Sequence, residues 1–360
     1  MAYTTIDDPS AHFQIATYTG NGSTGQNIIN DGNSDLQPDW VWAKRRDATT
    51  SHGLVDSSRG VRKVLSSNGT DAEYAESAGN TLTAFLSDGF TVGADGNYTA
   101  FNANGSSIVA WQWKANGGTT SSNTDGSITS TVQANTTAGF SIVLWTGSSA
   151  SATIGHGLSS APELVIVKNR TDSSTDWRIG NTVVSGKTMA DDNGYYLEFD
   201  TGAIANPGGK TIWGSGPSAP TSTVFSVGSN NSNNGSSDNM LAYCFHSVKG
   251  YSKIGSYTGN GNADGPFVYL GFKPALLITK RTDATSDWRI WDFKRDPENV
   301  VDRILYPSAN NGEGSETFGD FLSNGFKIRV TTSDYNASGG TYIYMAFAEH
   351  PFVSSEGVPV

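Results

Sequence analysis

The segment Pro162-Glu163-Leu164-Val165-Ile166-Val167-Lys168 is a proline, an apolar run and a lysine, and it occurs in three versions along the chain. The other two are Pro38-Asp39-Trp40-Val41-Trp42-Ala43-Lys44 and Pro274-Ala275-Leu276-Leu277-Ile278-Thr279-Lys280. Short apolar runs rich in Val, Ile and Trp are typical of strands that are buried on both faces. Each version therefore predicts one central β-strand.

Other marks surround each version in the same order. An aromatic-Thr-Gly turn precedes it, beginning at Tyr18, Trp145 and Tyr257. An apolar strand closes each copy, and these strands contain Val109-Ala110-Trp111, Leu241-Ala242-Tyr243 and Met345-Ala346-Phe347. Both alternating sets of residues in the closing strands are apolar, which again indicates a strand covered on both sides. The repeated order predicts a module written three times.

Six or seven strands in each copy, separated by Gly- and Asn-rich turns, predict an all-β fold of three tandem antiparallel β-sandwich modules, jelly-roll or lectin-like. The expected boundaries are an N-terminal arm at 1–11, module one at 12–116, a Ser/Thr/Asn/Gly linker at 117–138, module two at 139–249, module three at 250–353 and a C-terminal tail at 354–360. The linker segment can equally be a strap that wraps a module. At Lys249-Gly250 the closing strand of module two runs directly into the next opening strand, which predicts a hairpin and a stiff array.

Two polar residue types recur with the repeats. A lysine ends each Pro-to-Lys strand and an aspartate follows it, at Lys44, Lys168 and Lys280 and at Asp47, Asp172 and Asp283. A group needed for one active site has no reason to appear three times, so these residues predict a strand-end salt bridge or turn anchor. An Asp-x-x-Arg pair at 56–59 and 292–295 suggests further bracing, although module two lacks it.

The bulk composition excludes several classes of partner. The formal net charge is −11, and nucleic-acid binding needs clustered Lys and Arg. No stretch approaches the roughly 18–20 apolar residues of a membrane helix, and the first nine residues do not form a secretory signal. The single cysteine, Cys244, lies among apolar neighbours and is expected to be an inert buried thiol. We therefore expect neither nucleic acid nor membrane as a partner.

No catalytic or metal motif is evident. There is no Gly-x-Ser-x-Gly elbow, and the acidic group Glu313, Glu316 and Asp320 is confined to the third copy. The turn at 31–35 begins like a calcium loop, but Leu36 and Trp42 occupy positions where that loop needs Gly and Glu. The sequence predicts a non-enzymatic protein without cofactor or metal.

Aromatic residues at positions that do not repeat are the candidates for partner or glycan contact. They lie in polar, Gly-rich loops, where an exposed ring can stack on a sugar or anchor an interface: Tyr98, Phe101, Trp213 and Tyr335. The alternative, that each ring folds back over its own core, remains open on the sequence.

Several motifs also carry a family resemblance. The stretches Asp7-Asp8-Pro9-Ser10-Ala11-His12-Phe13-Gln14, Val109-Ala110-Trp111-Gln112-Trp113-Lys114-Ala115-Asn116-Gly117-Gly118 and Phe321-Leu322-Ser323-Asn324-Gly325-Phe326-Lys327 resemble virion proteins of marine and freshwater bacteriophages. These form an uncharacterised family of tandem β-modules, found among tail-fibre-like and other structural phage proteins.

This resemblance implies a component of the virion surface, of tail-fibre or head-decoration type, assembled in the bacterial cytoplasm. The implied partners are other virion proteins, further copies of the chain (a trimer is one option) and host surface glycans. The N-terminal arm is expected to dock on the particle. Two alternatives are a polysaccharide depolymerase and a glycan-binding lectin module.

Overall fold

The computed structural model describes residues 4–96, 100–192, 194–214 and 219–350. Its regular structure is dominated by antiparallel strands, which confirms the predicted all-β sandwich fold. The helical elements are the short segments η1 (Pro9–Ala11), α1 (Gly209–Trp213), α2 (Asn231–Asn234) and α3 (Ser333–Asn336).

The first sandwich contains two facing sheets. Its inner sheet has the order β1 (Phe13–Thr19), β9 (Ser107–Trp113), β3 (Trp40–Arg45) and β4 (Gly53–Asp56). The outer sheet has the order β2 (Gln26–Ile28), β8 (Phe90–Val92) and β7 (Leu82–Phe85), and a separate ribbon pairs β5 (Lys63–Val64) with β6 (Tyr74–Ala75). The Pro-to-Lys strand β3 therefore lies beside the closing strand β9.

The second sandwich repeats this succession in β12 (Phe140–Thr146), β19 (Asn239–Phe245), β14 (Leu164–Asn169) and β15 (Arg178–Asn181). Its inner sheet continues through β11 (Ser130–Asn135) and β10 (Ser121–Asn123) at one side, and through β16 (Tyr195–Glu198) and β17 (Asn206–Pro207) at the other. The facing sheet pairs β13 (Ala152–Gly155) with β18 (Val224–Val227).

In the third sandwich the inner sheet has the order β20 (Ser252–Thr258), β27 (Thr341–Phe347), β22 (Leu276–Arg281) and β23 (Arg289–Asp292). The outer sheet has the order β21 (Phe267–Tyr269), β26 (Gly325–Ile328), β25 (Gly314–Leu322) and β24 (Val301–Ile304). Each of the three inner sheets thus places its opening, closing, Pro-to-Lys and following strands in the same order.

Both faces of each inner sheet are buried, but against different neighbours. In β3, Val41 and Ala43 pack into the core of the first sandwich, whereas Trp40 and Trp42 join a larger cluster that draws residues from all three sandwiches. Because side chains alternate across a strand, one continuous apolar run serves both cores. The predicted burial of these strands on both sides is confirmed.

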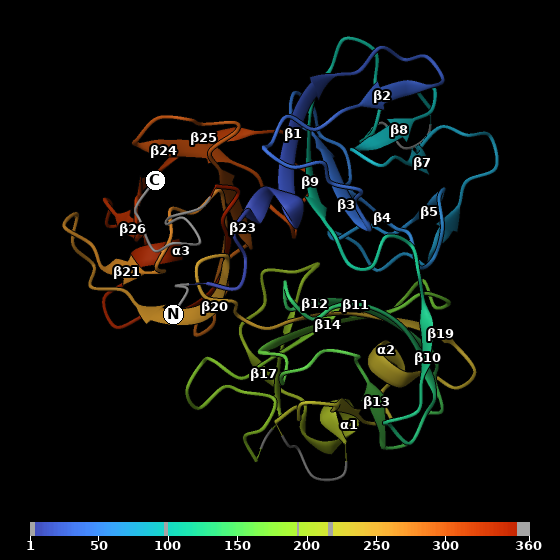
Figure 1. The fold of residues 1–360 in the computed structure, drawn as a ribbon. Helices are drawn as coiled ribbons and strands as arrows, with labels where there is room; N and C mark the ends of the chain where they lie inside the picture. The colour runs from blue at the N-terminus through green and yellow to red at the C-terminus, as the bar shows by residue number, and fades with distance from the viewer. Residues whose placement is uncertain (1–3, 97–99, 193, 215–218, 351–360) are drawn as a thin grey trace.

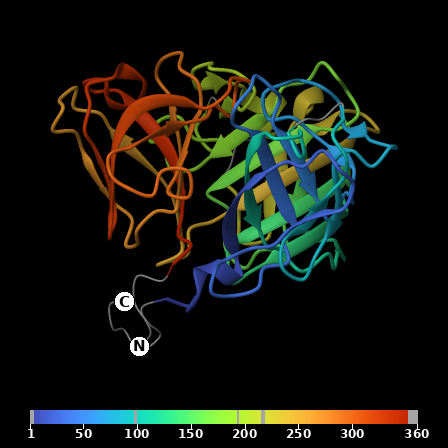
Figure 2. The ribbon, with the colours of Figure 1, turned by 90° about the horizontal axis from the view of Figure 1, so that it is seen from above.

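The shared cluster occupies the centre of the molecule. Trp113, Phe245 and Phe347 hold equivalent positions in the three closing strands, as their pairing with Trp40, Leu164 and Leu276 shows. The ring centroids of Trp113 and Phe347 are 5.6 Å apart, and those of Phe245 and Phe347 are 5.8 Å apart. The three sandwiches surround this core as three lobes (Figures 1 and 2).

This arrangement corrects the expected stiff array. The closing strand β19 pairs with β12 and β14, and the next opening strand β20 pairs with β27. At the joint itself only a short antiparallel bridge links Val248 to Ser252. Closing the apolar inner faces around one centre removes them from water, which favours this arrangement.

Two segments at the expected module borders pack against the sandwiches, so the segment at 117–138 is not a free linker. The expected linker contains β10 and β11, where Val132 packs into the second core and the Gln133 amide donates to Ser57 and Ser58 of the first sandwich. The described part of the N-terminal arm is also integrated, because Ile6 enters the shared core and Asp8 accepts a hydrogen bond from Ser34 at 2.7 Å. Neither segment is a free spacer.

Candidate functional site

Three of the aromatic residues predicted to contact partners are buried, so these predictions were wrong. Phe101, Trp213 and Tyr335 are each 0% exposed. Tyr335 donates from its hydroxyl to the Thr317 carbonyl at 2.6 Å, and Trp213 donates from Nε1 to the Tyr195 carbonyl at 2.9 Å. The loop with Phe101 and the short helices α1 and α3, which contain Trp213 and Tyr335, fold back over their own sandwiches. Tyr98 lies outside the described residues.

The repeated lysines are buried anchors for backbone carbonyls. Lys44 donates to the Arg45 carbonyl at 2.7 Å, Lys168 to the Thr70 carbonyl at 2.8 Å and Lys280 to the Arg281 carbonyl at 2.7 Å. Burial lowers the pKa of Lys44 and Lys168 to about 8 and that of Lys280 to about 7.

The repeated aspartates have partners other than these lysines. Asp47 pairs with Arg45 at 2.6 Å and Asp283 with Arg281 at 2.8 Å, whereas Asp172 accepts hydrogen bonds from Ser174. Of the two predicted roles, the lysine–aspartate salt bridge was wrong, whereas the aspartates anchor their own turns.

An ionic series that is buried at Arg59 and Asp56 and half-buried at Glu73 and Arg170 crosses the seam between the first and second sandwiches. Arg170 pairs with Glu73 at 2.9 Å, and Glu73 also accepts from Arg59 at 3.0 Å. Arg59 in turn pairs with Asp56 at 2.5 Å, and Tyr243 donates to the same carboxylate at 2.8 Å. Both carboxylates of this series, Asp56 and Glu73, are thus paired with a guanidinium group.

The seam between the third and first sandwiches repeats this series in equivalent positions. Arg46 pairs with Glu313 at 2.8 Å, Arg295 contacts Glu313 at 3.1 Å and Asp292 at 2.5 Å, and the indole of Trp111 donates to Asp292 at 3.0 Å. Glu313 is therefore committed to a structural bridge rather than to a paired-carboxylate site.

The seam between the second and third sandwiches is neutral at the same positions. Asn181 replaces the aspartate and accepts from the backbone N–H of Val184 at 2.9 Å, as Asp56 accepts from that of Arg59. Ala205 and Thr282 replace the outer Glu and Arg, and the Ala205 N–H still donates to the Thr282 carbonyl at 3.0 Å. Met345 occupies the position of Tyr243, so no side-chain donor comes from the closing strand.

A second contact is repeated at the seams, a hydrogen bond from a ring nitrogen to a backbone carbonyl of the neighbouring sandwich. Trp177 donates from Nε1 to the Ser66 carbonyl at 2.9 Å, and Trp288 donates to the Glu198 carbonyl at 2.7 Å. In the first sandwich His52 takes the place of the tryptophan and reaches the Tyr306 carbonyl from Nε2 at 3.0 Å. Copy one therefore makes the same contact to a backbone carbonyl, with the imidazole of His52 in place of an indole.

Exposed aromatic rings occur instead on β21, the edge strand of the third outer sheet. Phe267 is 45% and Tyr269 54% exposed, whereas Val268 between them is buried. The alternation of a strand puts both rings on the same face. Figure 1 places β21 at the outer margin of the third lobe, away from the shared core. This aromatic edge is the candidate contact surface of the described chain.

Polar groups frame the aromatic edge. Lys253 donates to the Tyr269 carbonyl at 2.7 Å and lies 5.6 Å from the centroid of its ring. Next to Phe267, Lys327 pairs with the exposed Asp264 at 2.6 Å. Gly325 lies under the Phe267 ring, where an added Cβ would come within 3.1 Å of Cε2. The edge thus presents two rings flanked by hydrogen-bonding groups.

Sequence reasoning missed this pair, although the repeats contain a signal for it. The register aligns Val268 with Ile28 and Ile154, which places Asn27 and Thr153 at the position of Phe267. At the position of Tyr269 the other copies have Ile29 and Gly155. A strand-by-strand comparison of the copies would have marked both aromatics as peculiar to the third.

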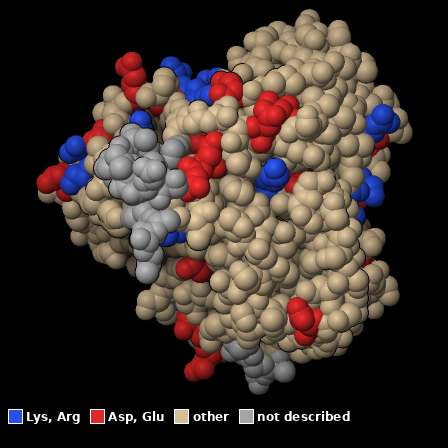
Figure 3. Space-filling view, viewed as in Figure 1, with Lys and Arg blue, Asp and Glu red and all other residues tan. Residues whose placement is uncertain are grey.

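Other classes of site find little support in the described residues. Among them no group of three or more His, Cys, Asp and Glu is arranged to hold a metal ion. Asp31, in the calcium-like turn, pairs with Lys294 at 2.7 Å. No helix in the described part of the chain is long and apolar enough to cross a membrane. On the face shown in Figure 3 uncharged residues dominate, with charges scattered between them.

The sequence matches one family along almost its whole length. This family is described as a domain of unknown function (DUF7483), and the match covers residues 8–351. No curated protein matches the chain.

Proposed function

The chain belongs to the DUF7483 family, and we propose that it is a non-enzymatic structural protein of the bacteriophage virion surface. The observation that carries this proposal is the shared core, which fixes three sandwiches in one body. An architectural component has to hold its surfaces in a constant geometry while it connects particle and environment. The resemblance of its motifs to phage virion proteins indicates where such a body is used.

The seams support an architectural role because neighbouring sandwiches are joined by specific side-chain contacts. Half-buried and buried side chains from neighbouring sandwiches meet in a hydrogen-bonded series, Arg170–Glu73–Arg59–Asp56, whose Arg59 and Asp56 end is buried. Moving one sandwich would break the buried hydrogen bonds of Tyr243 to Asp56 and of Trp111 to Asp292, each of which contributes about 1.5–3 kcal/mol as a bond to a charged group. The lobes therefore work as one rigid unit.

The contact function is assigned to the aromatic edge at Phe267 and Tyr269. Exposed rings that lie on one face and are bordered by donors and acceptors suit the stacking and hydrogen bonding of a sugar ring. Lys253, Asp264 and Lys327 supply those polar groups. A host-surface glycan is accordingly the proposed ligand class.

Immunogold electron microscopy of the phage whose genome encodes the chain tests the virion role. Gold on the capsid is expected for a head-decorating protein, and gold on the tail for a fibre component. Particles without gold, in a preparation where an antibody against a known capsid protein labels normally, would overturn the proposal.

A further inference from the structure

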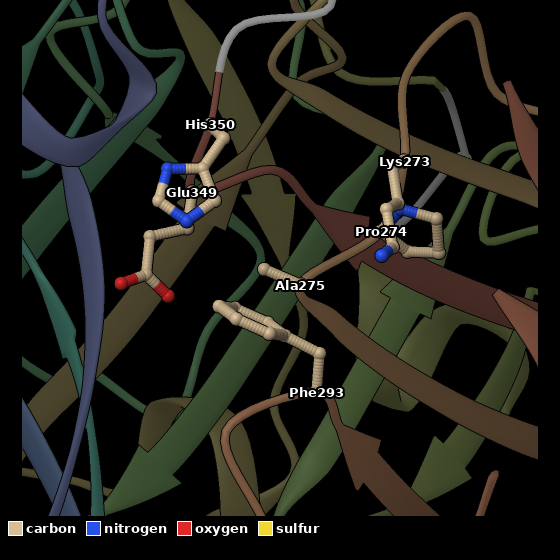
Figure 4. A pocket seen from close by; sticks show the side chains of 6 residues that line it. All are labelled: Lys273, Pro274, Ala275, Phe293, Glu349 and His350. Carbon is tan, nitrogen blue, oxygen red and sulfur yellow. The ribbon is translucent and has the colours of Figure 1, made fainter. Parts of the chain in front are cut away.

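The first sandwich has an open cleft between the edges of its two sheets. It holds about 270 Å³ and lies between β1, the edge strand of the inner sheet, and β2, the edge strand of the outer sheet. At roughly 30 Å³ per water molecule it has room for about nine waters. The cavity in Figure 4, walled by Pro274, Ala275 and Phe293, holds only about 60 Å³. The cleft is therefore the larger of these two spaces.

In the second sandwich the equivalent gap is filled by the chain itself. The register of the sheets aligns β12 with β1 and β13 with β2. The segment 127–131 crosses from β13 to β12, because the Ile128 N–H donates to the Thr153 carbonyl at 3.2 Å and Thr131 pairs with Leu144. The side chain of Ile128 packs against the second core. A short extended segment thus completes this sandwich.

The third sandwich closes its gap with a side chain. Lys253 of β20 donates to the Tyr269 carbonyl of β21 at 2.7 Å and so ties the two edges together. In the first sandwich Gln14 holds the position of Lys253, but its amide bonds the turn at 32–34. Of the three equivalent gaps as described, the one in the first sandwich therefore stays open.

Backbone hydrogen-bonding groups face the cleft from both sides. The His12 carbonyl and the Gly20 N–H, at the two ends of β1, bond residues that flank β9. Bonding directions alternate along an antiparallel strand, so Thr17 points its N–H and carbonyl away from β9. On the other edge, Asn27 occupies the position whose N–H and carbonyl bond the segment 127–131 in the second sandwich. Each side thus offers a donor and an acceptor.

The floor of the cleft suits an aliphatic side chain. Ala16, Tyr18 and Ile28 line it and belong to the core of the first sandwich. Ile28 holds the position of Ile154, which bridges to Ile128 in the second sandwich. An aliphatic group on this floor would take the place of Ile128.

Two side-chain contacts limit the length of chain that fits. At one end Gln26 donates to the Thr19 carbonyl at 2.9 Å. At the other, Asp31 pairs with Lys294 of the third sandwich at 2.7 Å. This pair holds the place that Gln133 takes against the first sandwich. The cleft therefore admits a segment of the length of 127–131 and excludes a longer strand.

We propose that this cleft docks a short extended segment of another virion protein, which bonds Thr17 and Asn27 through its backbone and places an aliphatic side chain on Ile28. When an extended segment adds to a strand edge, main-chain bonds give affinity and side-chain pockets give specificity. The source of the segment rests on the proposed virion role, whereas the cleft and its contacts do not.

A fluorescein-labelled peptide with the sequence of residues 125–133 is the probe, because this segment fills the equivalent gap in the second sandwich. It should bind the full chain saturably in fluorescence anisotropy. Ile128→Asp in the peptide should weaken binding at least about tenfold, since a charge would enter an apolar floor. No binding of the unchanged peptide by the folded chain would overturn the proposal.

Two proline variants distinguish this cleft from every other surface. Thr17→Pro and Asn27→Pro each remove an N–H that faces the cleft, and proline at such an edge position leaves the sheet ladder intact. Each should lower the affinity on the order of tenfold, through the loss of a hydrogen bond. Thr17→Val and Asn27→Thr keep the N–H and should retain binding. Circular dichroism checks that all four variants are folded.

The outcomes separate the cleft from its occupant. Equal affinity in the proline variants and their controls would exclude the cleft. Dimerisation of the chain that Thr17→Pro prevents would identify a second copy as the occupant and overturn the assignment to another protein. Gold-labelled particles combined with no peptide binding would remove this docking site and leave the virion role standing.

Discussion

The phenol of Tyr243 donates a hydrogen bond to the Asp56 carboxylate of the neighbouring sandwich, with 2.8 Å between the two oxygens. Trp111 makes the same contact with Asp292 at 3.0 Å. At the third seam Met345 has no hydrogen to donate, and the facing sandwich has Asn181 in place of the aspartate. Copy two lacks the Asp-x-x-Arg pair, and copy three, which faces it, lacks the side-chain donor that would bind such an aspartate. The buried carboxylate therefore occurs only at seams where the facing sandwich supplies a hydrogen-bond donor.

This matching predicts an unequal response at equivalent positions. Tyr243→Phe removes a donor from a buried carboxylate and should lower the free energy of unfolding by about 1.5–3 kcal/mol, as expected for hydrogen bonds to charged groups. Met345→Leu, the control at the neutral seam, should cost less than about 1.5 kcal/mol. Urea unfolding followed by tryptophan fluorescence measures both. Equal losses would show that the hydrogen bond contributes nothing specific.

The Arg170–Glu73 ion pair can be tested by a double-mutant cycle. The residues of the double variant already occur at the equivalent positions of the neutral seam. Glu73→Ala alone leaves Arg59 and Arg170 without this partner and should cost roughly 3 kcal/mol. Adding Arg170→Thr reproduces the Ala205 and Thr282 arrangement of the neutral seam and should restore part of that loss, with a coupling of about 0.5–3 kcal/mol. Strictly additive effects in urea unfolding would contradict a coupled pair.

The strands, the repeats and the burial of strands on both faces could be predicted from the sequence, because apolar patterns and turn residues act locally. It does not say which surface covers the second face of a run such as Trp40 to Ala43, since a partner chain and a neighbouring copy would leave the same pattern. The shared core and the seams therefore emerge only from the assembled chain.

The candidate site was harder to predict for a related reason. Phe101 lies in a polar loop, and Trp213 and Tyr335 lie in the short helices α1 and α3. A large ring loses more by exposure than a flexible segment loses by folding back. Phe267 and Tyr269 lie in a strand, where an aromatic is ordinarily expected to pack. Both rings project from the sheet face opposite the buried Val268, on a strand whose described pairing is with β26 alone, and this leaves them exposed.

Removing the two rings of the aromatic edge is expected to abolish binding without lowering the free energy of unfolding. Phe267→Ser together with Tyr269→Ser should abolish binding of the chain to host cells or to an array of their glycans. The free energy of unfolding should shift by no more than about 0.5 kcal/mol per site, as is usual for exposed positions. The matched control is Ile29→Ser, at the exposed position of the first sandwich that aligns with Tyr269. Undiminished binding by the double variant would exclude this edge as the contact surface.

His52 predicts a specific loss of stability in acid. The indole N–H of Trp42 donates to Nδ1 at 2.9 Å, so the neutral ring carries its proton on Nε2 and donates it to the Tyr306 carbonyl. Protonating Nδ1 would set two donors against each other in a buried site near Lys44. Burial, with Lys44 adding to it, lowers the pKa of His52 to about 3. The unfolded chain therefore binds more protons than the folded one between about pH 6.5 and 3.

The stability contributed by neutral His52 is thus fully present above pH 6.5 and is lost as the pH falls, by about 2 kcal/mol between pH 7 and pH 5. Asp200 and Glu349 act in the opposite direction, because burial raises their pKa to about 7 and about 8. The informative quantity is therefore the difference between wild type and His52→Gln, whose amide offers both an acceptor and a donor without titrating. Urea unfolding at the two pH values should give a loss about 2 kcal/mol smaller in the variant. If wild type and variant lose the same free energy, protonation of His52 does not drive acid unfolding at this seam.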